Sequence, residues 1–104
     1  METNKPPTEN YNLQEFFQEV DRIANLHRKL RDERKEIVLL IKSNEADIEI
    51  CTYRLDAHPE RREYYEERLD EDRRNLAILQ KHLIAVDSNI QEVESMLIAH
   101  DTRV

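Results

Sequence analysis

Four histidines and one cysteine are the residues of this chain best suited to metal binding or nucleophilic chemistry. They are His27, His58, His82, His100 and Cys51. No two histidines have the i,i+4 spacing with which a helix presents two imidazoles to zinc. Glycine is absent, so no glycine-rich loop is available to hold a phosphate group. We therefore expect no metal site, no cofactor, no catalytic site and a protein that is not an enzyme.

The basic stretch at residues 28–35, Arg-Lys-Leu-Arg-Asp-Glu-Arg-Lys, is the positively charged segment that could bind phosphate. Asp32 and Glu33 interrupt it, and each can pair along a helix with a base four residues earlier. The chain has a formal charge of −7, which disfavours nucleic acid and anionic membranes as partners. Phosphate or nucleic-acid binding through this stretch is the alternative function.

The composition indicates long amphipathic helices and not a compact globule. Charged residues make up 38% of the chain, and glycine and tryptophan are absent. Tight β-hairpin turns need residues at positive φ, which glycine supplies most readily. A lone cysteine fits a reducing compartment, and no apolar run approaches the ~20 residues of a membrane span. We expect an intracellular, soluble protein, cytoplasmic or nuclear, that has no membrane partner.

A sevenfold apolar repeat runs along both halves of the chain. Stepping alternately by three and four residues gives a nearly continuous apolar row, the pattern of a coiled-coil seam. The predicted seam consists of Phe16, Val20, Ile23, Leu30, Ile37, Ile41, Ile48, Leu69, Leu76, Leu79, Leu83, Val86, Ile90, Val93 and Leu97. Two such helices must lie side by side if both seams are to leave water. The fold class predicted is all-α, an antiparallel coiled-coil hairpin.

Sequence signals at two places set the boundaries of this hairpin. Asn12 can cap a helix and Glu15 completes a capping-box-like pair, so a helix is predicted to begin near residue 12. Proline favours the first turn of a helix, so Pro59 indicates a reversal and a new start. The predicted organisation is a disordered or extended tail over 1–11 and a hairpin over 12–101, with helices at 12–56 and 59–100 and a turn at 57–59.

Two polar seam positions, Asn44 and Asp72, lie near one another if the chain folds back at residue 58. They can form a polar layer that fixes the register of the two helices, or they can belong to a loosely packed, hydrated end of the seam near the turn. Ser43 and Asn44 also favour helix starts, which would split the first helix and give a three-helix bundle. The apolar repeat continues through this region without a slip, which favours one continuous helix.

Apolar residues away from the seam form a candidate interaction surface. Two helices alone cannot bury them, and each large aliphatic side chain left in water forfeits about 1.5–3 kcal/mol relative to full burial. The candidate surface consists of Phe17, Ala24, Val38, Leu39, Leu40, Ile78, Ile84 and Ile98. A further helix could cover it, from a second copy in a four-helix bundle or from another protein.

Two segments resemble parts of a known family. Residues 13–23, Leu-Gln-Glu-Phe-Phe-Gln-Glu-Val-Asp-Arg-Ile, resemble the opening of the first helix in the N-terminal regulatory bundle of syntaxins. Residues 82–92, His-Leu-Ile-Ala-Val-Asp-Ser-Asn-Ile-Gln-Glu, are similar to the later part of that bundle's second helix. The resemblance implies a helical module that docks onto membrane-fusion partners.

These observations lead to one functional expectation. The chain is predicted to be a non-enzymatic coiled-coil module for protein–protein interaction and oligomerisation, an adaptor or scaffold. Its expected partners are protein helices, in a homodimer or a hetero-oligomer.

Overall fold

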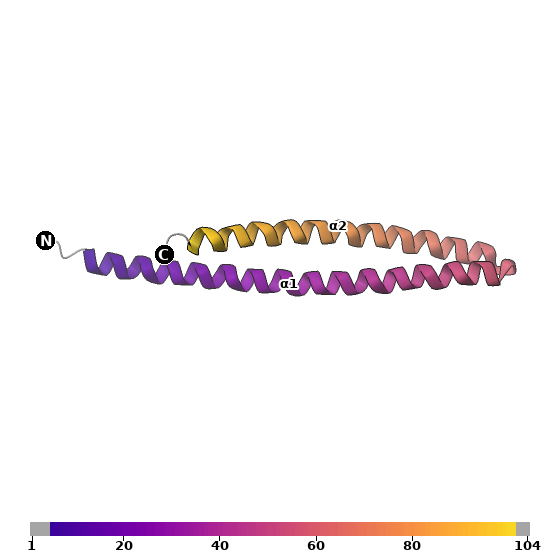
Figure 1. The fold of residues 1–104 in the computed structure, drawn as a ribbon, viewed down its shortest axis with the longest axis horizontal. Coiled ribbons are helices and arrows are strands. Elements are labelled where there is room, and N and C mark those ends of the chain that lie inside the picture. The colour runs from indigo at the N-terminus through magenta and orange to yellow at the C-terminus, as the bar shows by residue number, and fades with distance from the viewer. Residues whose placement is uncertain (1–4, 102–104) are drawn as a thin grey trace. The chain divides into compact units, whose positions relative to one another are not determined.

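The computed structural model describes the backbone of residues 5–101 and the side chains of residues 13–100. It contains two long helices, α1 (Lys5–Ala57) and α2 (Arg62–Asp101), joined through a 3₁₀ turn, η2 (Pro59–Arg61) (Figure 1). No strand occurs between residues 5 and 101. The prediction of an all-α fold with two long helices is confirmed. None of the described helices is both long enough and apolar enough to cross a membrane.

The start of α1 differs from the prediction. The helix begins at Lys5, so residues 5–11 are helical where an extended tail was predicted, and Asn12 lies within a helix and does not cap its start. Residues 1–4 of that tail lie outside the described part. Pro6 and Pro7 fall in the first turn of α1, where backbone N–H groups have no partner within the helix. Their missing N–H groups therefore cost no hydrogen bond, and the two prolines do not exclude a helix.

The reversal falls at the predicted proline. His58, the residue before Pro59, has φ −130° and ψ 73°, outside the helical region, because a proline ring disfavours a helical conformation at the preceding residue. The His58 N–H donates to the Arg54 carbonyl at 2.9 Å, and the Arg61 N–H donates to the His58 carbonyl at 3.0 Å. The second helix was predicted to begin at residue 59. The chain forms η2 first, and α2 begins at Arg62.

The helix α1 continues through Ser43 and Asn44, so the three-helix alternative is wrong. Capping propensity at these residues competes with the packing of Ile41, Ile48 and Cys51, which are half-buried or buried. Most helical stability in proteins comes from burying an apolar face and not from local propensity. Packing of the seam therefore outweighs the local start signal.

The two helices pack within two separate units. Among the described residues, the terminal unit comprises residues 5–31 and 89–101, and the turn unit comprises residues 32–88. In the terminal unit the rings of Phe16 and His100 lie 5.4 Å apart. Further along α1 and earlier in α2, His27 Nε2 lies 3.0 Å from Glu94 Oε2. Since one residue number rises as the other falls, the helices of this unit run antiparallel.

The turn unit is also antiparallel and has its own core. Cys51, Tyr65 and Leu69 form a buried cluster near the turn, and Ile48 and Leu55 pack against it. The Cys51 thiol donates to the Tyr65 carbonyl at 3.6 Å. Farther from the turn, Arg34 Nε donates to Asp87 Oδ1 at 2.6 Å.

The residues of the predicted seam lie on the inner sides of these helices. Every one of them is buried or half-buried. The buried members are Ile23, Ile37, Leu69, Val86 and Val93. Burial therefore follows the sevenfold repeat in both units.

Candidate interaction surface

The apolar residues predicted to lie off the seam divide into two groups. Ala24 and Val38 are half-buried. The six larger members expose between 55% and 70% of their surface; they are Phe17, Leu39, Leu40, Ile78, Ile84 and Ile98. Phe17 and Ile98 belong to the terminal unit and the other four to the turn unit. The sequence therefore predicted correctly that these six side chains are exposed. They do not all lie in one unit, so they do not form a single surface.

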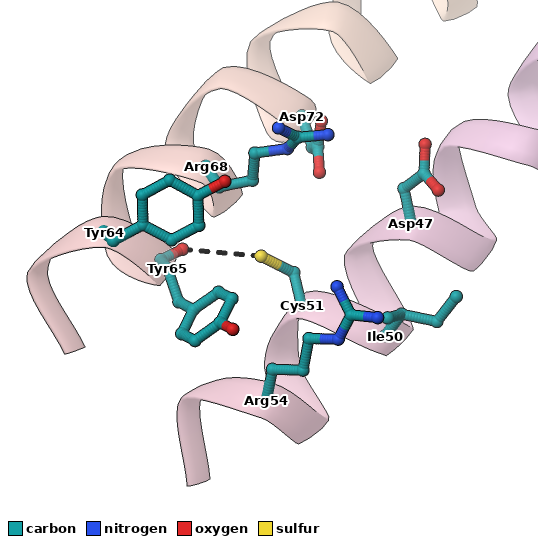
Figure 2. Close-up of a pocket in the computed structure, with 8 residues that line it drawn as sticks. All are labelled: Asp47, Ile50, Cys51, Arg54, Tyr64, Tyr65, Arg68 and Asp72. Atoms are coloured by element: carbon teal, nitrogen blue, oxygen red, sulfur yellow. Dashed lines mark hydrogen bonds between the residues drawn. The ribbon is translucent and has the colours of Figure 1, made fainter. Parts of the chain in front are cut away.

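Leu40 and Ile78 come together on the rim of a groove between α1 and α2 in the turn unit. The groove consists of two adjoining hollows that share Asp47. The larger hollow, of about 370 Å³, is lined by Leu40, Ser43, Asn44, Asp47, Asn75, Ile78 and Leu79. The smaller, of about 120 Å³, lies nearer the turn and is lined by Asp47, Ile50, Cys51, Arg54, Tyr64, Tyr65, Arg68 and Asp72 (Figure 2).

Two further apolar side chains, Ile50 and Tyr64, line the smaller hollow and were missed by the sequence analysis. With Leu40 and Ile78 they give the groove four apolar residues, each 48–56% exposed. The position of Tyr64 carried a usable signal, because Tyr64 and Ile78 are separated by two heptads and so share one side of α2. A search for repeats beside the seam would have found Tyr64, but Ile50 has only Ser43 and Ala57 one heptad away and carries no such signal.

The predicted polar layer lies in the floor of this groove. Asn44 lines the larger hollow and Asp72 the smaller one. Asp72 is only 8% exposed. Asp72 Oδ2 and Asn44 Oδ1 are both buried and accept no hydrogen bond from the described residues. The two residues therefore present unused acceptors, and their role in fixing register stays a prediction.

Charged side chains of both signs surround the floor. Figure 2 shows Asp47 and Arg54 on α1, and Arg68 and Asp72 on α2. None of these four forms an ion pair with another residue in the described part of the chain. Asp47, Arg54 and Arg68 are exposed and so stay hydrated. The groove thus combines apolar rims, unused acceptors in its floor and unpaired charges.

The histidines and the cysteine of the described part lie in separate surroundings. Between residues 13 and 100, no group of three or more His, Cys, Asp or Glu side chains could hold a metal ion. The Cys51 thiol is buried and is engaged by the Tyr65 carbonyl. His27 approaches Glu94, and His58 Nδ1 lies 3.3 Å from Glu60 Oε1. His82 is exposed and His100 packs near Phe16.

The resolved pKa shifts belong to ion pairs within single helices. A hydrogen bond from Arg22 lowers the pKa of Glu19, and the same bond raises the pKa of Arg22. A hydrogen bond to Glu66 likewise raises the pKa of Arg62. These pairs lie on solvent-exposed helix surfaces, where ion pairs contribute little to stability. They do not indicate a general acid or base.

The basic stretch is partly engaged within the chain. Arg28 Nη1 donates to Asn25 Oδ1 at 3.0 Å, and Arg34 is paired with Asp87. Lys29, Arg31 and Lys35 are exposed. The bases that could bind phosphate are therefore fewer than the sequence indicates.

Comparison of the chain with protein-family models, with curated proteins and with solved structures finds no match. The similarity of residues 13–23 and 82–92 to syntaxins therefore stays a prediction. The assignment of a function depends on the surface chemistry described above.

Proposed function

We propose that this chain is a non-enzymatic coiled-coil module that binds other helices, as an oligomerisation element or adaptor. The observation that carries the proposal is the exposed apolar set. Six large apolar side chains are 55–70% exposed on helices whose seam residues are already buried or half-buried. Exposed apolar patches on protein surfaces mark interaction sites, and two of these six side chains, Leu40 and Ile78, line one hollow of the turn unit.

The size of the hydrophobic effect supports association over exposure. Removing apolar surface from water contributes about 25 cal/mol per Å², so fully burying one Leu or Ile side chain contributes about 1.5–3 kcal/mol. Several such side chains covered together can offset the entropy that two molecules lose when they associate. Helices are suitable partners because their side-chain ridges fit the grooves between the helices of a pair. A four-helix bundle is the simplest product.

Light scattering coupled to size exclusion tests this proposal. We expect the full chain to form a discrete species heavier than its 12.5 kDa monomer at tens to hundreds of micromolar. Gln80→Glu is the control, because it adds a charge at an exposed residue and removes no apolar surface. A mass of one chain across the whole concentration range would contradict the proposal.

A further inference from the structure

The groove of the turn unit has features that identify a partner. Building on the proposed function, we infer that this groove binds the same groove of a second copy of the chain. The inference depends on four properties of the groove: its charge balance, the lack of partners for its charges, the acceptors in its floor and its apolar rims.

The first property is charge balance. The chain has a formal charge of −7, so most approaches between two copies are repulsive. The groove is different because its two acids, Asp47 and Asp72, are matched by its two bases, Arg54 and Arg68. Two identical grooves placed face to face can therefore set each acid of one copy against a base of the other. An isologous contact of this kind closes after two copies.

The second property is that these charges form no ion pair with another side chain between residues 13 and 100. The turn unit pairs Arg34 with Asp87 across its two helices, so its helices can form such contacts. At the groove the same two helices leave their acids and bases unpaired among the described residues. An identical groove supplies the missing partners in equal number.

The third property is the acceptors in the floor. An unpartnered carboxylate oxygen is costly to bury, and Asp72 is only 8% exposed. Arg54 and Arg68 are long donors that line the same hollow and are exposed to solvent. In a groove-to-groove contact, the arginines of one copy lie over the floor of the other, where they can form charge-assisted hydrogen bonds with the exposed Asp47 and lower the electrostatic cost of the buried Asp72 carboxylate.

The apolar rims provide contact area. A stable interface buries about 800 Å² from each partner, which is about a tenth of the 8344 Å² surface of this chain. Leu40, Ile50, Tyr64 and Ile78 line the groove and are each about half exposed. Tyrosine is among the residue types most enriched at the centre of interfaces, and the three aliphatic side chains add apolar area to be buried.

Charge reversal within the groove provides the decisive experiment. Asp47→Arg makes the groove net positive, and the double variant Arg54→Asp/Arg68→Asp makes it entirely acidic. We expect each variant alone to raise the dissociation constant of the homodimer by at least about tenfold, since each one removes cross-copy pairs. Mixed one to one, the two variants should form a heterodimer of twice 12.5 kDa, with affinity restored to within severalfold of the wild type.

Matched controls carry the same charge changes outside the groove. They are Asp70→Arg and the double variant Arg73→Asp/Arg74→Asp, all at exposed residues of α2. Their homodimers should be within about threefold of the wild type. Equal losses in control and groove variants, or a mixture that stays monomeric, would overturn the inference. Circular dichroism of each variant verifies that the helices are intact.

A second pair of variants tests the rims independently of charge balance. Leu40→Glu/Ile78→Glu should abolish self-association, and Leu39→Glu/Ile84→Glu, which changes residues outside both hollows, should not. The reverse result would refute the groove as the contact and leave the proposed function intact. A wild type that is monomeric at every concentration would refute the proposed function as well, so the two failures are distinguishable.

Discussion

At the scale of single residues, His27 and Arg34 show how a nearly apolar interface is given a register, because both stand at polar positions of the seam repeat between Ile23 and Ile37. Arg34 and His27 are separated by seven residues on α1, and their acidic partners Asp87 and Glu94 are separated by seven on α2. Each base therefore has an acid at the matching position of an antiparallel partner helix. A shift of either helix by one residue would separate these pairs, so the pairs favour the observed register.

Replacing Arg34 tests how much such a pair contributes to stability. The Arg34 and Asp87 side chains are 46% and 42% exposed, and ion pairs at that exposure contribute about 0–1 kcal/mol. A leucine at the same seam position would bury apolar surface, and this burial should stabilise the fold by more than the ion pair does. We expect Arg34→Leu to raise the free energy of unfolding by about 1 kcal/mol in urea titrations at fixed protein concentration.

Asp87→Asn is the control for that measurement, because it weakens the same pair and adds no apolar surface. It should change the free energy of unfolding by less than about 1 kcal/mol. A destabilised Arg34→Leu variant would indicate that the ion pair outweighs seam burial at this position.

Asp72 gives the second prediction at this scale. Its buried oxygen accepts no hydrogen bond from the described residues, and a buried polar group without a partner costs about 1–3 kcal/mol. We expect Asp72→Leu to raise the free energy of unfolding of the dilute monomer by a similar amount, measured by denaturant titration. The exposed neighbour substitution Asp70→Leu should have an effect within about 0.5 kcal/mol. If Asp72→Leu destabilised the monomer, Asp72 would need a stabilising role within the single chain.

At the scale of helices, the sequence predicted what depends on periodicity. The seam residues, the reversal at Pro59 and the continuity of α1 all follow from apolar spacing and from the geometry of proline. The start of α1 could not be predicted in the same way. Residues 5–11 lack an apolar repeat, so periodicity does not predict a helix there. The capping signal at Asn12 indicated a start at residue 12, although the helix extends back to Lys5. Ile50 was missed because a groove depends on how two helices meet, which a pattern along one helix does not describe, whereas the spacing of Tyr64 from Ile78 could have been found.

The buried cluster beside the turn allows a prediction about the turn unit. Leu69 is 4% exposed and packs with Cys51 and Tyr65. Truncating a buried leucine costs about 2–5 kcal/mol, because it loses apolar burial and leaves a cavity. We expect Leu69→Ala to lower the free energy of unfolding by that amount in thermal or urea unfolding. Leu13→Ala, at a residue that is 53% exposed, should cost less than about 1 kcal/mol; equal costs would contradict a buried seam.

At the scale of the whole molecule, charge separates the two candidate functions. A chain with a formal charge of −7 is repelled by polyanions at long range, and only a local cluster of bases could overcome this. All five bases of residues 28–35 are exposed, but the charge of Arg34 is matched by Asp87, and Arg28 donates one hydrogen bond to the neutral Asn25 amide. Association through apolar side chains needs no cluster of bases, because the free energy gained by burying apolar surface does not come from charge.

Retention on heparin decides between these functions. Each phosphate-like contact of a polyanion-binding protein releases counterions, so its affinity falls steeply as salt rises. We expect the chain to elute from heparin without retention at 0.15 M salt, since net repulsion outweighs the local positive charge of residues 28–35. The triple variant Lys29→Glu/Arg31→Glu/Lys35→Glu should elute at the same volume. Retention of the wild type that is lost both in this variant and at high salt would instead favour phosphate binding through residues 28–35.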